Sequence, residues 1–136
     1  MSAERLARLA AAPVLFQAEV PGTNLRVYVV GGTVVAAYEI VSDELDYRGA
    51  ETEVRPMRLT PAEADACRPP ATACEMPFTG LDLRRGPDGR LVVLECDPSP
   101  MFAGIQRRTG TEPVSDALAE LLHQTCSQGA GPARLV

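Results

Sequence analysis

Apolar and polar residues alternate along two stretches of the chain that a Gly31-Gly32 pair separates. A period of two is typical of β-strands, and paired glycines favour the tight turn of a hairpin. Leu25, Val27 and Val29 should therefore share one face of a sheet. The same reasoning predicts a turn at Pro21-Gly22, a polar loop at 42–49, and strands at 14–17, 24–30, 33–41 and 52–59.

A helix start follows, with Thr60 as the N-cap, Pro61 in the first turn and Glu63 three residues after the cap. A Thr and a Glu at this spacing form a reciprocal capping box, and proline is tolerated at the first helical position. Pro69-Pro70 should end or interrupt the helix, because proline lacks the N–H that the helix interior needs. A second short helical piece is expected at 71–76.

Helical periodicity also marks both ends of the chain. Residues 1–12 are typical of a short amphipathic helix, and a final helix is expected at about 114–126 with Ser115 or Thr111 as its cap. Ala117, Leu118, Leu121 and Leu122 should face inward. We expect one α+β domain over 1–128, an antiparallel sheet with helices on one face, and a disordered tail at 129–136.

Three carboxylates lie on one predicted hairpin, whose turn is Gly-Pro-Asp-Gly at 86–89. Asp82 should lie opposite the end of the second strand, where Glu95 and Asp97 project to the same side. Acidic oxygens that converge in this way repel each other unless a hard cation such as Mg²⁺ lies between them. The alternative is a solvated acidic face, but the apolar neighbours on the hairpin favour a metal site.

The composition limits the classes of protein to which this chain can belong. With 136 residues and 46% hydrophobic content, the chain can bury a core. A net charge of −5 argues against a nucleic-acid partner, and no stretch has transmembrane length. All 13 basic residues are arginine. The four cysteines lack zinc-ligand spacing, so free thiols and a cytoplasmic location are expected.

The order of several motifs resembles the C-terminal half of ATP-grasp enzymes, most closely the RimK-like branch with its peptide-cyclising maturases. The likeness covers roughly residues 10–125. That family joins a carboxylate to an amine through an acylphosphate and consumes Mg-ATP. The motifs are Phe16-Gln17, Gly22-x-Asn24-Leu25-Arg26, Asp46-Tyr47-Arg48, Gly80-x-Asp82 and Glu95-x-Asp97-Pro98-Ser99-Pro100.

The resemblance implies roles for individual residues. Gln17, Ala18, Glu19 and Val20 would form the hinge that contacts adenine, and Asn24 would bind the ribose. Arg48 would lie at the phosphates or the acyl intermediate, and Arg26 would also face the site. Asp82, Glu95 and Asp97 would hold Mg²⁺ or Mn²⁺, with Asp97 in place of the family's usual Asn. Either arginine could be an ordinary surface ion-pair residue, and taken alone we favour this interpretation for Arg26 but not for Arg48, which lies in an irregular loop beside Asp46 and Tyr47.

Enzymes of this branch carry a lysine-bearing lobe before the hinge, and the present chain has no lysine. Phosphoryl transfer needs positive charge around the γ-phosphate. Two hypotheses therefore remain open. The chain could be the Mg-ATP-binding lobe of a ligase, not competent alone and completed by a separate N-terminal chain or by oligomerisation. It could instead be a non-catalytic remnant that serves as a binding or regulatory module.

Overall fold

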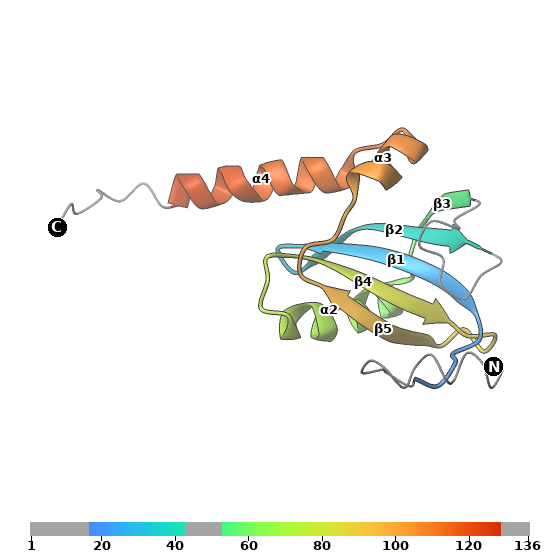
Figure 1. Cartoon of the computed structure of the whole chain (residues 1–136). Coiled ribbons are helices and arrows are strands. Elements are labelled where there is room, and N and C mark those ends of the chain that lie inside the picture. Colours follow the sequence, from blue (N-terminus) through green and yellow to red (C-terminus); the bar gives the residue numbers. More distant parts are fainter. Residues whose placement is uncertain (1–16, 43–52, 129–136) are drawn as a thin grey trace, which may run out of the picture.

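The computed structural model describes residues 17–42 and 53–128. The protein is α+β, and its sheet is antiparallel throughout, as the sequence predicts (Figure 1). The predicted helix at 1–12, the strand at 14–17, most of the loop at 42–49 and the tail at 129–136 lie outside the described residues. The elements are β1 (Thr23–Val30), β2 (Thr33–Val41), β3 (Glu53–Met57), α2 (Pro61–Ala73), β4 (Phe78–Arg85), β5 (Leu91–Asp97), α3 (Ala103–Thr109) and α4 (Pro113–Gln128).

The five strands lie in the order β3-β2-β1-β4-β5, so β1 is central and pairs with both β2 and β4. The predicted hairpins are confirmed: β1 and β2 join at Gly31-Gly32, and β4 and β5 join across residues 86–89. Positive φ angles at both glycines explain why this residue type occupies the first turn. The order places β4 and β5 beside β1, although more than 45 residues separate β1 from β4 along the chain.

The helices are divided between the two faces of the sheet, which corrects the prediction of helices on one face. Leu25, Val27 and Val29 do share a face, as predicted, and α2 packs there through Cys67 and Ala71. On the opposite face Tyr28, Tyr38 and Ile40 pack with Val114 of α4 and with side chains of the α3 segment. Strands β1 and β2 carry buried apolar side chains on both sides, so each side needs a cover to remove these side chains from water.

Helix α2 begins as the sequence predicts and ends later. The capping box is complete: the Glu63 N–H donates to Thr60 Oγ1, and the Thr60 N–H donates to Glu63 Oε2 at 2.8 Å. Burial alone would raise the pKa of Glu63, but hydrogen bonds from Thr60 and Arg85 hold that pKa below its usual range. The helix continues through Pro69 and Pro70 into the predicted second piece, because burial of its inward face against the sheet outweighs the lost hydrogen bonds.

The junction of α3 and α4 is fixed by one buried side chain. Gln106 Oε1 accepts hydrogen bonds from the N–H groups of Val114 (2.9 Å) and Ser115 (3.1 Å), and its Nε2 donates to Ser115 Oγ. Gln106 thus accepts from first-turn N–H groups of α4, the role that we assigned to Ser115 or Thr111. Leu118 packs against the sheet, but Leu122 is 64% exposed instead of inward, since α4 runs on past the sheet (Figure 1).

Two of the four cysteines form a disulfide, which corrects the expectation of free thiols. Cys74 at the end of α2 is joined to Cys96 of β5, while Cys67 and Cys126 are free. Cys96 packs on the α2 face, away from its neighbours Glu95 and Asp97, as strand alternation predicts.

In the part of the chain that the structure describes, no helix is long and apolar enough to cross a membrane.

Gly22 places the segment before β1 against the β4–β5 turn. Its φ is +138°, and a Cβ at this position would lie 2.1 Å from the carbonyl oxygen of Arg85. Its own carbonyl accepts a 2.7 Å hydrogen bond from Arg84. Only glycine allows both the backbone angle and the close approach.

We therefore expect Gly22→Ala to lower the free energy of unfolding by about 3 kcal/mol, measured by chemical denaturation. Gly89→Ala is the matched control: Gly89 also has a positive φ, but a Cβ at this position would have no atom within 4 Å. The control should lose only about 1 kcal/mol, the cost of the left-handed backbone. Equal losses in the two variants would contradict the close-approach explanation.

Candidate functional site

One row of cross-strand neighbours carries the charged groups that the sequence predicted. Arg26 of β1 pairs with Asp82 of β4, and Asp82 pairs with Glu95 of β5. Asp97 lies two residues further along β5, opposite Gly80, and therefore points to the same face as Glu95. The antiparallel register thus brings residues from three strands together on the face that carries Tyr28 and Tyr38.

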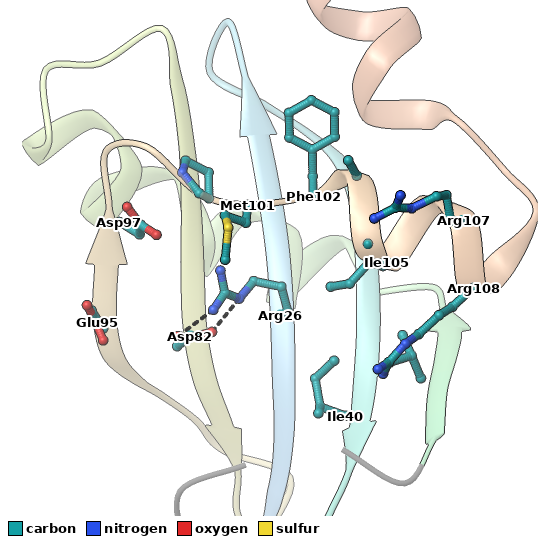
Figure 2. A pocket seen from close by; sticks show the side chains of 14 residues that line it. Arg26, Ile40, Asp82, Glu95, Asp97, Met101, Phe102, Ile105, Arg107 and Arg108 are labelled. Atoms are coloured by element: carbon teal, nitrogen blue, oxygen red, sulfur yellow. Dashed lines mark hydrogen bonds and ion pairs between the residues drawn. The ribbon is translucent and has the colours of Figure 1, made fainter. Parts of the chain in front are cut away.

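These side chains line a cavity of about 630 Å³ between that face of the sheet and the α3 segment (Figure 2). A volume of this size suits a small-molecule ligand. The lining combines charged groups with apolar ones from β2, β3 and α3. It consists of Arg26, Ile40, Val54, Asp82, Glu95, Asp97, Pro100, Met101, Phe102, Ala103, Gly104, Ile105, Arg107 and Arg108.

Arg26 and Asp82 form a two-point ion pair inside the cavity. Arg26 Nε lies 2.5 Å from Asp82 Oδ1, and its Nη2 donates to Asp82 Oδ2 at 2.8 Å. The two side chains are only 15% and 18% exposed. A largely buried bidentate pair is stronger than an exposed one, because water screens it less and both carboxylate oxygens are satisfied. Arg26 is thus an ion-pair residue, but its pair lies in the cavity and is largely buried, not on the open surface.

Asp97 begins the turn that leads out of the sheet. Its Oδ1 accepts a 2.8 Å hydrogen bond from the Ser99 N–H, and its carbonyl accepts one from the Thr79 hydroxyl. Gly80 leaves room for the turn, since a Cβ there would lie 2.6 Å from Pro100 Cβ. Within residues 17–42 and 53–128, no three His, Cys, Asp or Glu side chains are grouped closely enough to hold a metal ion. The metal set stays a prediction that requires side-chain rearrangement.

The segment after Asp97 is tied back onto the sheet. The fully buried Tyr28 donates a 2.7 Å hydrogen bond from its hydroxyl to the carbonyl oxygen of Met101. Its ring also packs against the rings of Phe78 and Phe102. This anchor sets where α3 starts and leaves the Met101 side chain 88% exposed at the cavity edge.

The other predicted site residues that the structure describes do not line this cavity. Gln17, Ala18, Glu19 and Val20 precede β1 without regular secondary structure, and the first three are exposed. Asn24 shares a strand face with Arg26 but is buried and is not among the lining residues. Arg48 lies outside the described residues. The structure therefore brings together Arg26 and the three carboxylates, and it leaves the adenine and ribose contacts untested.

Sequence reasoning missed the far wall of the cavity. Arg107 and Arg108 of α3 and the apolar side chains of Ile40, Val54 and Ile105 all line it. One hint in the sequence concerns the two arginines alone: they are adjacent and follow shortly after the Pro98-Ser99-Pro100 turn. Which side of α3 faces the sheet depends on packing, so the pattern alone could not assign these residues to the cavity.

Comparison with known proteins defines the class of this chain. Residues 13–122 match the RimK-like ATP-grasp domain, so the chain belongs to the RimK-like ATP-grasp family. A probable alpha-L-glutamate ligase of Picosynechococcus sp. is 34% identical over 117 residues, which cover 82% of this chain and 38% of the relative. A second, from Thioalkalivibrio sulfidiphilus, is 32% identical over 127 residues, with 85% and 41% coverage. The chain thus spans about two fifths of the length of these curated relatives.

Solved structures agree with the assignment of the fold. The ATP-grasp ligase PsnB, in complex with a phosphomimetic variant of its minimal precursor, Mg and ADP, superposes with a TM-score of 0.74 at 36% identity. The match covers 91% of this chain and 40% of PsnB. The α+β architecture described above is therefore that of part of an ATP-grasp ligase, and the resemblance inferred from the sequence motifs is confirmed.

The Tyr28 anchor can be tested by removing one hydroxyl. Tyr28→Phe should lower the free energy of unfolding by about 1 kcal/mol, because the Met101 carbonyl loses its buried donor. Tyr38→Phe is the control, since the Tyr38 hydroxyl makes no hydrogen bond within the described part of the chain. Chemical denaturation of both variants measures the difference. A loss in Tyr38→Phe as large as in Tyr28→Phe would contradict the anchoring role.

Proposed function

We propose that this chain forms the Mg-ATP-binding C-terminal part of an ATP-grasp carboxylate–amine ligase. The observation that carries the proposal is the register of the sheet. It makes Asp82 and Glu95 direct neighbours, places Asp97 on the same face, and opens all three onto one cavity. Carboxylates on rigid strands, with room beside them for phosphate oxygens, suit Mg²⁺, which combines a few carboxylates with substrate phosphates and water.

Asp82 would be the metal ligand from β4, and the bound ion would supply positive charge beside the phosphate oxygens. The Asp82 carboxylate also pairs with Arg26 through both of its oxygens, which offsets part of the negative charge of the three carboxylates. Arg26 would also face the site, from β1. Glu95 and Asp97 would complete the ligand set from β5.

The adenine and ribose would lie toward the start of β1. Contacts to adenine through the backbone of residues 17–20 do not depend on side-chain identity, so Ala18 and Glu19 remain compatible with a hinge. Asn24 follows that segment directly and can offer one hydrogen bond to a ribose hydroxyl. Arg48 would approach the phosphates or the acyl intermediate from the loop between β2 and β3. PsnB, which is 36% identical, was solved with Mg and ADP, and this supports the proposal.

We further propose that the chain needs additional protein to transfer a phosphoryl group. The curated relatives are much longer, and this chain has no lysine to place at the phosphates. Arginines and Mg²⁺ would supply positive charge from one side of the nucleotide only, whereas catalysis of this transfer depends on charge positioned all around it. The additional protein would complete the site from the other side of the nucleotide. A non-catalytic binding module is the alternative, and the replacement of the family's acidic ribose residue by Asn24 favours it.

The metal site predicts Mg-dependent nucleotide binding. Calorimetry of the purified chain should show ADP binding that strengthens with Mg²⁺, and Asp82→Asn or Glu95→Gln should weaken it about tenfold or more, because each removes a charged ligand. Glu75→Gln is the control, since Glu75 is exposed and lies outside the cavity.

Two results would contradict the proposal. Equal Mg-ADP affinity in wild type, Asp82→Asn and Glu95→Gln would rule out the carboxylates as metal ligands. ATP turnover by the purified 136-residue chain, lost in Glu95→Gln, would show that no further protein is needed. Asp82→Asn and Glu95→Gln should both remain folded, and circular dichroism checks this directly.

A further inference from the structure

The segment that would contact adenine is held to the sheet through Gly22. Residues 17–22 have no regular secondary structure, and all of them except Val20 are exposed. Within the described part of the chain, the hydrogen bond that links this segment to a side chain runs from Arg84 Nη1 to the Gly22 carbonyl oxygen, at 2.7 Å. A segment without strand hydrogen bonds takes its position from the scaffold beside it. Arg84 therefore helps to decide where residues 17–22 lie.

Arg84 reaches Gly22 from the strand that carries the first proposed metal ligand. It lies two residues after Asp82 on β4, so the two side chains project to the same face of the sheet. It is also the cross-strand partner of Asn24, which follows the segment on β1. Two residues along a strand span roughly 7 Å. The hydrogen bond between Arg84 and Gly22 therefore joins the proposed adenine segment closely to the proposed metal site.

The surroundings of Arg84 strengthen this hydrogen bond. The residue is only 9% exposed. A charged donor bonds more strongly than a neutral one, and the exclusion of water strengthens the attraction further. The long side chain of arginine also allows a donor on β4 to reach the chain that precedes β1.

Arg85, the next residue on β4, makes hydrogen bonds of the same kind on the other face of the sheet. Its Nη2 and Nε donate to Glu63 Oε1 of α2, at 2.6 and 3.0 Å. The side chain of Arg85 thus stabilises α2 on the sheet, and the side chain of Arg84 holds the adenine segment. Variants of the two arginines can therefore separate a general contribution to folding from a contribution to this segment.

We propose that Arg84 is a positioning residue for the nucleotide. Its guanidinium holds the Gly22 carbonyl, so that the backbone of residues 17–20 lies at a fixed distance from the carboxylates of β4 and β5. The inference rests on the proposed function, which places adenine at one end and the Mg-bound phosphates at the other. Two linked contacts reinforce each other only when their spacing matches the ligand. Arg84 acts through the segment and does not contact adenine or phosphate itself.

The test compares a ligand that has both ends with a ligand that has one. In calorimetry of the purified chain, Arg84→Met should weaken Mg-ADP binding at least about tenfold, because the adenine segment loses a charge-assisted hydrogen bond. The same variant should bind Mg-pyrophosphate, which has no adenine or ribose, as the wild type does. Arg85→Met is the matched control and should keep the wild-type affinity for both ligands.

Circular dichroism checks that each variant is folded. If Arg84→Met does not fold, Arg84→Lys takes its place, since lysine keeps the charge but has a shorter side chain without the guanidinium. This variant should also weaken Mg-ADP binding and leave Mg-pyrophosphate binding unchanged.

Several results would overturn the inference and leave the proposed function standing. Equal losses for Mg-ADP and Mg-pyrophosphate would mean that Arg84 serves the phosphates, and no loss for either would mean that it positions nothing. A loss in Arg85→Met as large as in Arg84→Met would assign the effect to destabilisation of β4. Wild-type binding of Mg-ADP without binding of Mg-pyrophosphate would show that the two ends do not bind separately. Failure of the wild type to bind Mg-ADP would instead overturn the proposed function, and the inference with it.

Discussion

The rest of the structure depends on the pairing and burial of the central strand β1. It pairs on one side with β2 and on the other with β4, and its two faces contribute to both hydrophobic clusters. Arg26 is its charged side chain on the cavity face, and the carboxylate of Asp82 on the adjoining strand satisfies it. A charge on a strand this buried would be costly without that partner. The ion pair therefore belongs to the fold as well as to the site.

This dual role links the fold to the proposed site. The backbone positions of Asp82, Glu95 and Asp97 are fixed by strand pairing, so the proposed ligands need not be assembled from loops. A site built on strands holds its geometry better than one built on loops.

The sequence predicted what local patterns determine. Alternation placed Leu25, Val27 and Val29 on one face, the turn at residues 86–89 paired the acidic strands, and the motif order from the hinge to Pro100 identified the family. The sequence did not predict the features that depend on packing between elements. Helix α2 continues through Pro69 and Pro70, and Gln106 takes the capping role assigned to Ser115 or Thr111. Both outcomes depend on packing between elements and not on the local pattern of either element, as does the placement of Arg107 and Arg108 in the cavity.

The location of the metal is the central claim, and Mn²⁺ can report it directly because this ion broadens the NMR signals of nearby nuclei. With ADP present, substoichiometric Mn²⁺ should erase the amide signals around Asp82, Glu95 and Asp97 first. Signals from the exposed end of α4 near Leu122 should persist. Uniform broadening over the chain, or loss centred away from β4 and β5, would contradict the account.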